Sequence, residues 1–177
     1  MPNQVREIRA RVKAGIREYQ FGRAIRRIAA SAASDVPETK LIWHLFSAWG
    51  NQSYGADPEY LEEVIRISAK TSEPILECGS GLTTILLGLF AGRRGIPVWT
   101  LEHDAYWYKQ TAATLSRYGI DGVELLLTPL RSYGEFSWYD PPLHQMPKRF
   151  GMVVCDGPPK KATRGDRYGL LPVMRDR

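Results

Sequence analysis

Acidic residues and glycines follow a short apolar run in the segment PILECGSGLTTILLG, residues 74–88. The run ends at Glu77, the chain then passes through Gly79, Ser80 and Gly81, and apolar residues resume at helical spacing. Glycines let the backbone turn tightly and approach a ligand, and the N–H groups at the start of a helix attract an anion. The pattern therefore predicts a strand, a phosphate-sized loop and a helix, the unit that binds nucleotide-like ligands.

Two further acids occupy comparable positions. Glu102 ends a second apolar run and lies 21 residues beyond Gly81, where an acid is placed to accept hydrogen bonds from ribose hydroxyls. The alternative is a structural acid at a helix start, a role that Asp104 is also able to fill. Asp156 follows the apolar run FGMVVC, residues 150–155, and so lies at the carboxyl end of an expected buried parallel strand, where open α/β sheets bind ligands.

The loop departs from the dinucleotide fingerprint G-x-G-x-x-G, because its third position is Thr84 and because Glu77 ends the strand. It resembles instead the first motif of class I S-adenosylmethionine-dependent methyltransferases. The spaced set LECGSGLTT, LEHD, VVCDGPP and RYGLLP extends the resemblance, from about Trp49 to Pro172, to bacterial members of that family that act on small molecules.

The resemblance implies a role for each matching position. It assigns the methionine part of S-adenosylmethionine to Glu77, Gly79, Ser80 and Gly81, with Thr84 completing the motif. It assigns the ribose to Glu102, the surroundings of the adenine to His103 and Leu130, and a place beside the sulfonium to Asp156. Asp156 is the candidate catalytic residue: it would orient the acceptor, take its proton, or help hold a divalent ion.

The resemblance implies methyl transfer to a hydroxyl or amine of a small-molecule acceptor. Because that reaction is an in-line displacement between aligned partners, it needs no nucleophilic side chain. The alternative is a cofactor-binding module without turnover of its own, completed by self-association or by another chain. An NAD-dependent oxidoreductase is a third and less favoured hypothesis.

The fold class expected is α/β and Rossmann-like, with a central, mostly parallel sheet flanked by helices. Helices are expected over residues 35–50, after Asp35 as the cap, and from Asp57 onward. Trp49, Asn51 and Tyr54 are candidates for the rim of the cleft. A third strand is expected over 122–127, followed by Thr128 and Leu130 as possible adenine contacts.

The aromatic- and proline-rich segment 131–149 is too irregular for a helix. Two interpretations remain open: a hairpin or loop over the cleft, or a surface segment anchored by Trp138 and Tyr139. His144 has no partner at ligand or triad spacing and is expected at the surface.

The family's sheet has seven strands, yet only 18 residues follow Pro159. We therefore expect an incomplete C-terminal part, with residues 167–176 as the next helix, and an exposed edge on the fourth strand. A shortened core that self-associates through that edge, giving a homo-oligomer, is the favoured interpretation. The alternatives are a truncated product, an edge covered by the segment 131–149 with the N-terminal helices, or an edge covered by another chain.

Composition limits the remaining possibilities. A chain of 177 residues with 44% hydrophobic content is expected to form one core, and no run approaches the ~20 apolar residues of a membrane span. No secretory signal is visible, so a cytoplasmic location is expected. Cys78 and Cys155 are expected to be buried thiols, close together if their strands are neighbours.

The positive charge is concentrated in residues 1–34, which hold eight Arg or Lys against two Glu, whereas residues 35–177 hold sixteen basic and seventeen acidic side chains. Apolar residues at helical spacing make the first segment a basic amphipathic helical arm, and 35–177 the Rossmann-like cofactor-binding domain. The arm has three interpretations: a helix docked on the domain, which we favour, a membrane-surface or targeting helix, or a nucleic-acid-binding arm, which is the least favoured.

Overall fold

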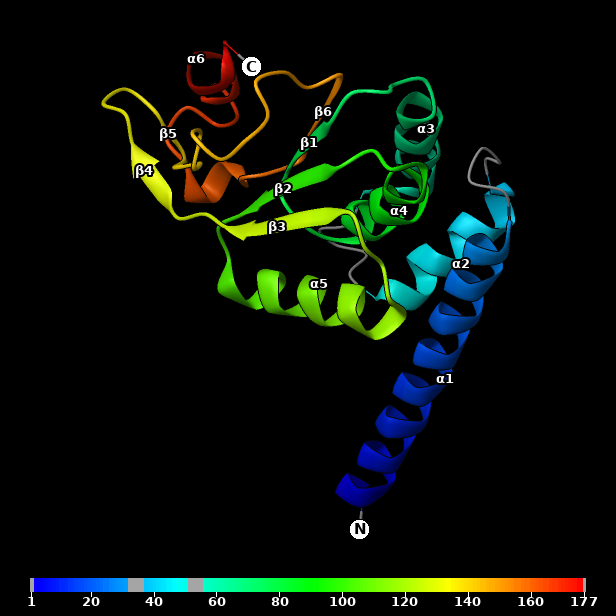
Figure 1. Ribbon diagram of the computed structural model, residues 1–177. Coiled ribbons are helices and arrows are strands. Elements are labelled where there is room, and N and C mark those ends of the chain that lie inside the picture. Colours follow the sequence, from blue (N-terminus) through cyan, green and yellow to red (C-terminus); the bar gives the residue numbers. More distant parts are fainter. Residues whose placement is uncertain (1, 32–36, 51–55, 177) are drawn as a thin grey trace.

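The computed structural model describes residues 2–31, 37–50 and 56–176. Six α-helices are described in that part of the chain: α1 Pro2–Ala30, α2 Thr39–Trp49, α3 Pro58–Ser68, α4 Leu82–Phe90, α5 Ala105–Tyr118 and α6 Leu170–Met174. Six strands accompany them: β1 Ile75–Cys78, β2 Val98–Glu102, β3 Val123–Leu127, β4 Leu130–Ser132, β5 Ser137–Tyr139 and β6 Met152–Cys155. Figure 1 shows these elements around a central sheet.

The central sheet has four parallel strands in the order β3-β2-β1-β6. The chain runs outward from β1 through β2 to β3 and then returns to the other side of β1 with β6. The order therefore reverses between β1 and β6, and ligands of open α/β sheets bind beside the carboxyl ends of strands at such a point. An α/β, Rossmann-like arrangement of a parallel sheet flanked by helices is confirmed.

One face of the sheet is covered by helices. Alternate side chains of the strands, including Ile75, Val98 and Val154, pack against α3 and α4. Gly88 of α4 permits a close approach, because a Cβ there would lie 2.5 Å from Ile120 and 2.8 Å from Val123. The helix is buried along its whole length, so it fixes the loop that precedes it.

The opposite face is covered by the antiparallel hairpin β4–β5, the segment that follows it, and α6. Trp138 and Tyr139 are completely buried against Leu76, Cys78 and Leu101 of the sheet. The segment 131–149 thus contains a hairpin anchored by these two aromatic residues, and it covers a face of the sheet. His144 lies at the surface as expected.

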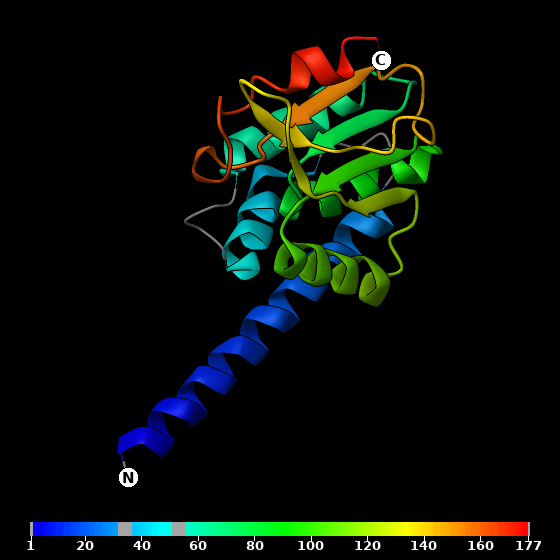
Figure 2. The same ribbon diagram turned by 90° about the vertical axis from the view of Figure 1, so that its left-hand side faces the viewer.

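The arm forms a single helix with two different environments. Phe21, Ala24, Ile25 and Ile28 are buried in the same core as α2 and α4. The N-terminal part of α1 extends away from the rest of the molecule in both views (Figures 1 and 2). The interpretation of a docked helix therefore holds for the C-terminal part of α1 only.

Capping residues in the sequence correctly predicted where two of the helices begin. Asp57 accepts the Tyr60 N–H at 2.7 Å before Pro58 begins α3, and Asp104 accepts the N–H groups of Tyr106 and Trp107 at the start of α5. The expected cap Asp35 and the rim candidates Asn51 and Tyr54 lie outside the described residues. No helix of the described chain is long and apolar enough to cross a membrane.

Candidate functional site

A cleft of about 750 Å³ lies at the carboxyl ends of β1, β2 and β6. Its lining joins six of the residues singled out from the sequence: Gly79, Ser80, Gly81, Glu102, His103 and Asp156. Trp49 lines it as well, in keeping with its expected position at the rim. Residues from separate parts of the chain thus meet where the order of the strands reverses.

Glu102 holds the glycine-rich loop in place. Its Oε2 accepts hydrogen bonds from both the N–H and the hydroxyl of Ser80, each at 2.8 Å, and its Oε1 accepts the N–H of Asp104, also at 2.8 Å. His103 Nδ1 lies 3.1 Å from Oε1. Burial opposes ionisation of Glu102, but these donors outweigh it and lower its pKa.

Glu77 lies behind the loop, fully buried, and does not line the cleft. Its Oε2 accepts the hydroxyls of Thr84 at 2.7 Å and Thr100 at 2.8 Å, whereas its Oε1 has no hydrogen-bond partner within the described chain. Burial raises the pKa of Glu77 to about 7, even though the threonine hydroxyls favour the ionised form.

Thr84 also lies outside the cleft lining, and it connects Glu77 to the loop. Its Oγ1 accepts the Gly81 N–H at 2.9 Å while donating to Glu77. The N–H groups of Ser80 and Gly81, expected to face a ligand, are therefore occupied by Glu102 and Thr84. Glu77 and Thr84 shape the loop from behind, and direct cofactor contacts by them remain a prediction.

The loops after β1 and β6 touch each other. Gly79 has φ +96°, and a Cβ there would lie 2.9 Å from the Gly157 nitrogen. A Cβ at Gly157 would meet the Tyr139 hydroxyl at 2.5 Å. A Cβ at Gly81, by contrast, would meet nothing within 4 Å, so the space over that part of the loop is open.

Asp156 lies on the side of the cleft formed by β6. Arg167 donates to its backbone oxygen at 2.5 Å and lies 3.3 Å from its Oδ1. Tyr60 of α3 lines the same side, and its pKa is raised by burial and by the charge of Asp156. Arg167 begins the motif RYGLLP, which gave it no role at the site, and Tyr60 lies outside every motif, so only tertiary contact reveals that both face Asp156.

The two cysteines are neighbours, as expected for adjacent strands. Cys78 and Cys155 are register partners on β1 and β6, and both are free thiols. A hydrogen bond to Cys155, together with burial, raises the pKa of the Cys78 thiol. Cys78 is buried as expected, whereas Cys155 is only half-buried because it lines the cleft. The hydrogen bond from Cys78 lowers the pKa of the Cys155 thiol.

Leu130 does not line the cleft. It pairs with Tyr139 in the hairpin and is half-buried against the core between the hairpin and the sheet, and Thr128 is buried outside the lining. His103 and Trp107 instead border the cleft near Glu102. Contact of Leu130 with an adenine ring remains a prediction that this arrangement does not support.

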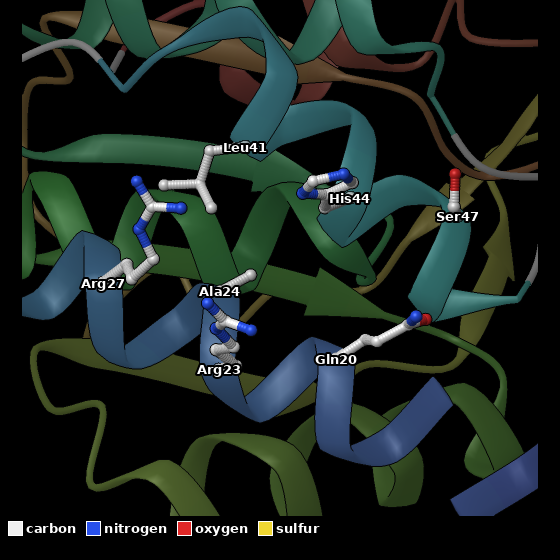
Figure 3. A pocket seen from close by; sticks show the side chains of 7 residues that line it. All are labelled: Gln20, Arg23, Ala24, Arg27, Leu41, His44 and Ser47. Carbon is white, nitrogen blue, oxygen red and sulfur yellow. The ribbon is translucent and has the colours of Figure 1, made fainter. Parts of the chain in front are cut away.

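A second, smaller hollow of about 250 Å³ is lined by residues of α1 and α2, which otherwise pack against each other. Figure 3 shows its lining: Gln20, Arg23, Ala24, Arg27, Leu41, His44 and Ser47. It contains no acid and none of the strand ends, so the larger cleft is the better candidate for a reaction site.

No group of three potential metal ligands among His, Cys, Asp and Glu occurs within the described ranges. A divalent ion held with the help of Asp156 stays a prediction. Comparison with family models, with curated proteins and with solved structures finds no match for this chain.

Proposed function

We propose that this chain binds S-adenosylmethionine and transfers its methyl group to a hydroxyl or amine of a small-molecule acceptor. One observation carries the proposal: the glycine-rich loop, Glu102 and Asp156 follow three adjacent parallel strands and line a single cleft. A volume of about 750 Å³ suits a ligand of nucleoside size together with part of an acceptor.

The residues present fit the chemistry of this cofactor. Leu82 and Thr83 begin α4 and line the cleft, and the first N–H groups of a helix have no acceptor within it. They suit the methionine carboxylate, and the open space over Gly81 allows it to approach. Pyrophosphate recognition has less support, since Glu102 and Thr84 already occupy two loop N–H groups.

Glu102 suits the ribose if one of the protein groups that donate a hydrogen bond to its carboxylate moves away. Ser80 contributes two of the three hydrogen bonds to the carboxylate, and its hydroxyl, which also accepts a hydrogen bond from the Thr111 hydroxyl at 3.3 Å, is the donor that is able to rotate away. We propose that a ribose hydroxyl replaces the Ser80 hydroxyl on Oε2, while the backbone bond continues to hold the loop. His103 and Trp107 are then the ring-bearing side chains beside the adenosine.

Asp156, Arg167 and Tyr60 form the acceptor side. The cofactor supplies an electrophilic methyl group on a sulfonium, so the protein has to align an acceptor and receive its proton. Asp156 is the group that accepts a hydrogen bond from the acceptor hydroxyl or amine. Arg167 fixes the orientation of Asp156 through its contacts with the backbone oxygen and Oδ1.

The second candidate function is a cofactor-binding module without turnover of its own. The side chain of Asp156 is 46% exposed and Arg167 is 45% exposed, so the acceptor side is open to water in a single chain. An open site aligns an acceptor poorly. This alternative predicts cofactor binding without methyl transfer until a second chain encloses the cleft.

Isothermal titration calorimetry with S-adenosylhomocysteine, with NAD as the control ligand, tests the cofactor. We expect saturable binding of S-adenosylhomocysteine alone. NAD binding alone would replace the proposal with an oxidoreductase, and binding of neither would refute a nucleotide site in this chain.

A methyl-transfer assay on hydroxyl and amine acceptors then separates the two candidate functions. Asp156→Asn is expected to retain S-adenosylhomocysteine binding and to abolish transfer. If transfer survives in Asp156→Asn, Asp156 has a structural role; if the wild-type chain binds but never transfers, the binding module is correct.

A further inference from the structure

The N-terminal part of α1 carries an apolar stripe that nothing in the described chain covers. Its members lie three or four residues apart and are at least half exposed: Val5, Ile8, Val12, Ile16 and Tyr19. Spacing of this kind places side chains on one face of a helix. Solvent exposure of five large apolar groups in a row is unfavourable, which indicates that this face has a partner.

The stripe faces away from the protein's own core. At about 100° per residue, its centre lies roughly 170° around the helix from the centre of the buried group Phe21, Ala24, Ile25 and Ile28. The same helix therefore presents one side to the domain and the opposite side outward. Folding of the domain against α1 leaves the stripe free, and Figures 1 and 2 both show this part of α1 standing clear.

Charge identifies the kind of partner. Arg9 and Lys13 border the stripe on one side and Arg11 borders it on the other, as judged from the helical spacing. The two acids of this part of the helix, Glu7 and Glu18, fall on the far half, and Glu18 is paired with Arg117 of α5. Arg9 and Lys13 thus give the stripe a positive border on one side, whereas on the other side Arg11 lies about 20° from Glu18, whose charge is paired with Arg117.

The positive border continues toward the domain. Arg23, Arg26 and Arg27 are exposed on the same side of α1 as the stripe. Arg23 and Arg27 flank the hollow shared with His44 and Ser47 of α2 (Figure 3). Apolar residues at the free end and arginines at the docked end make one continuous outward face.

We propose that α1 binds the surface of an anionic lipid bilayer, with the stripe in the interface and the arginines against the headgroups. An apolar face with a basic border on an exposed helix is what such a surface binds, and neither part alone suffices. A second copy is a poorer occupant, because helix pairing would bring the basic borders together. The core of the domain lies on the opposite side of α1, and α5 and α2 flank the docked end of the outward face, at Tyr19 and Arg26 and at Arg23 and Arg27. The N-terminal part of α1, which stands clear of the domain, is the part that is free to lie on the bilayer.

Vesicle flotation of the full chain tests this proposal. We expect the protein to float with phosphatidylcholine vesicles containing about 30% phosphatidylglycerol, and about tenfold less with phosphatidylcholine alone. Binding should fall at about 0.5 M NaCl, because salt screens the headgroup attraction. Absence of flotation with the anionic vesicles would overturn the proposal.

Two matched variants separate the stripe from general charge. Val12→Glu adds a negative charge within the stripe, whereas Ala10→Glu adds the same charge on the opposite, exposed side of the helix. We expect about a tenfold loss of binding for Val12→Glu and less than a twofold loss for Ala10→Glu. Circular dichroism checks that both variants are folded, and equal losses in the two variants would contradict a role for the stripe.

Light scattering of the same proteins tests the competing occupant. We expect the wild-type chain and Val12→Glu to have the same mass in solution. A dimer that Val12→Glu dissociates would assign the stripe to a second copy and overturn lipid binding. The proposal does not depend on the cofactor, so calorimetry with S-adenosylhomocysteine is expected to be unchanged in both variants.

Discussion

At the scale of single residues, Glu102 has a structural role that its contacts show and a ribose-binding role that we propose. A ribose acceptor and a structural acid were alternatives for this position, and the carboxylate already accepts three hydrogen bonds from the protein. In the proposed function, cofactor binding has to exchange one of those bonds for a ligand hydroxyl. The cofactor therefore gains only the difference in free energy between the old hydrogen bond and the new one. That gain is smaller than the gain from a hydrogen bond to an acceptor that had no partner before.

Glu102→Gln and Ser80→Ala test this exchange. Glu102→Gln replaces one acceptor oxygen by a donor, and we expect a loss of roughly 1–3 kcal/mol in S-adenosylhomocysteine affinity by calorimetry. Ser80→Ala removes the competing hydroxyl and retains the N–H, so affinity should equal or exceed that of the wild type. If Ser80→Ala weakens binding as strongly as Glu102→Gln does, the carboxylate acts only by shaping the loop.

The raised pKa of Glu77 predicts how the stability of the fold depends on pH. Its pKa rises from 4.5 in the unfolded chain to about 7 in the folded one, so the folded state keeps a proton that the unfolded state releases between these values. The stabilising contribution is complete below pH 4.5 and is lost as pH rises through 7. The full loss amounts to about 3 kcal/mol.

Urea unfolding at pH 5 and pH 8 measures this contribution. Glu77→Gln has no carboxyl proton to release. Its free energy of unfolding should therefore fall less between pH 5 and pH 8 than that of the wild type. Glu135→Gln, at an exposed acid, is the control and should decline as the wild type does. A wild-type decline in Glu77→Gln would show that another group causes the pH dependence.

At the scale of elements, the hairpin β4–β5 takes the place of helices on one face of the sheet. Its contribution comes from Trp138 and Tyr139, which cover the apolar side chains of β1 and β2. Gly169 lets the chain before α6 close over the hairpin, because a Cβ there would lie 2.5 Å from the Cβ of Trp138. The hairpin, the sheet and α6 therefore stabilise one another.

Trp138→Ala is expected to destabilise the fold by roughly 3–5 kcal/mol, because it leaves a cavity beneath the sheet. Trp43→Ala, at a tryptophan of α2 that is 44% exposed, should cost less than about 1 kcal/mol. Urea unfolding followed by far-ultraviolet circular dichroism makes the comparison without relying on tryptophan fluorescence. Equal costs for the two changes would mean that the hairpin is not part of the stabilising core.

At the scale of the whole molecule, β6 ends the sheet with no neighbour on its outer side in the described chain. Val153 of β6 is 46% exposed and lies in an apolar groove of about 590 Å³ with Phe150, Tyr168 and Leu171. An unpaired strand beside an apolar groove favours association. We therefore retain self-association at this edge as a prediction.

Light scattering over a range of concentrations tests it. We expect a mass above the 20.0 kDa of one chain, and a return to that mass in Val153→Lys. Val12→Glu serves as the control, since its site lies on α1, far from β6 along the chain. A constant mass of 20.0 kDa at all concentrations would refute self-association.

Local sequence determined the elements and the positions of the acids. Short apolar runs, glycines and capping residues act over a few residues, so β1, β2, β3 and β6 and the starts of α3 and α5 could be predicted from them. Because the carboxyl ends of parallel strands meet at one edge, the same pattern located Glu102 and Asp156 near the glycine-rich loop.

Only the tertiary structure decided which groups face the cleft and which hold it from behind. Burial placed Glu77 and Thr84 beneath the loop and Leu130 between the hairpin and the sheet, whereas packing brought Arg167 and Tyr60 to Asp156. In the sequence, the apolar residues of α1 recur with one helical period along the whole helix. Only the packing of the domain against the C-terminal part of α1 shows that one group of them is buried and that the stripe is exposed. Periodicity defines the faces of an element, and contacts between distant segments determine what each face meets.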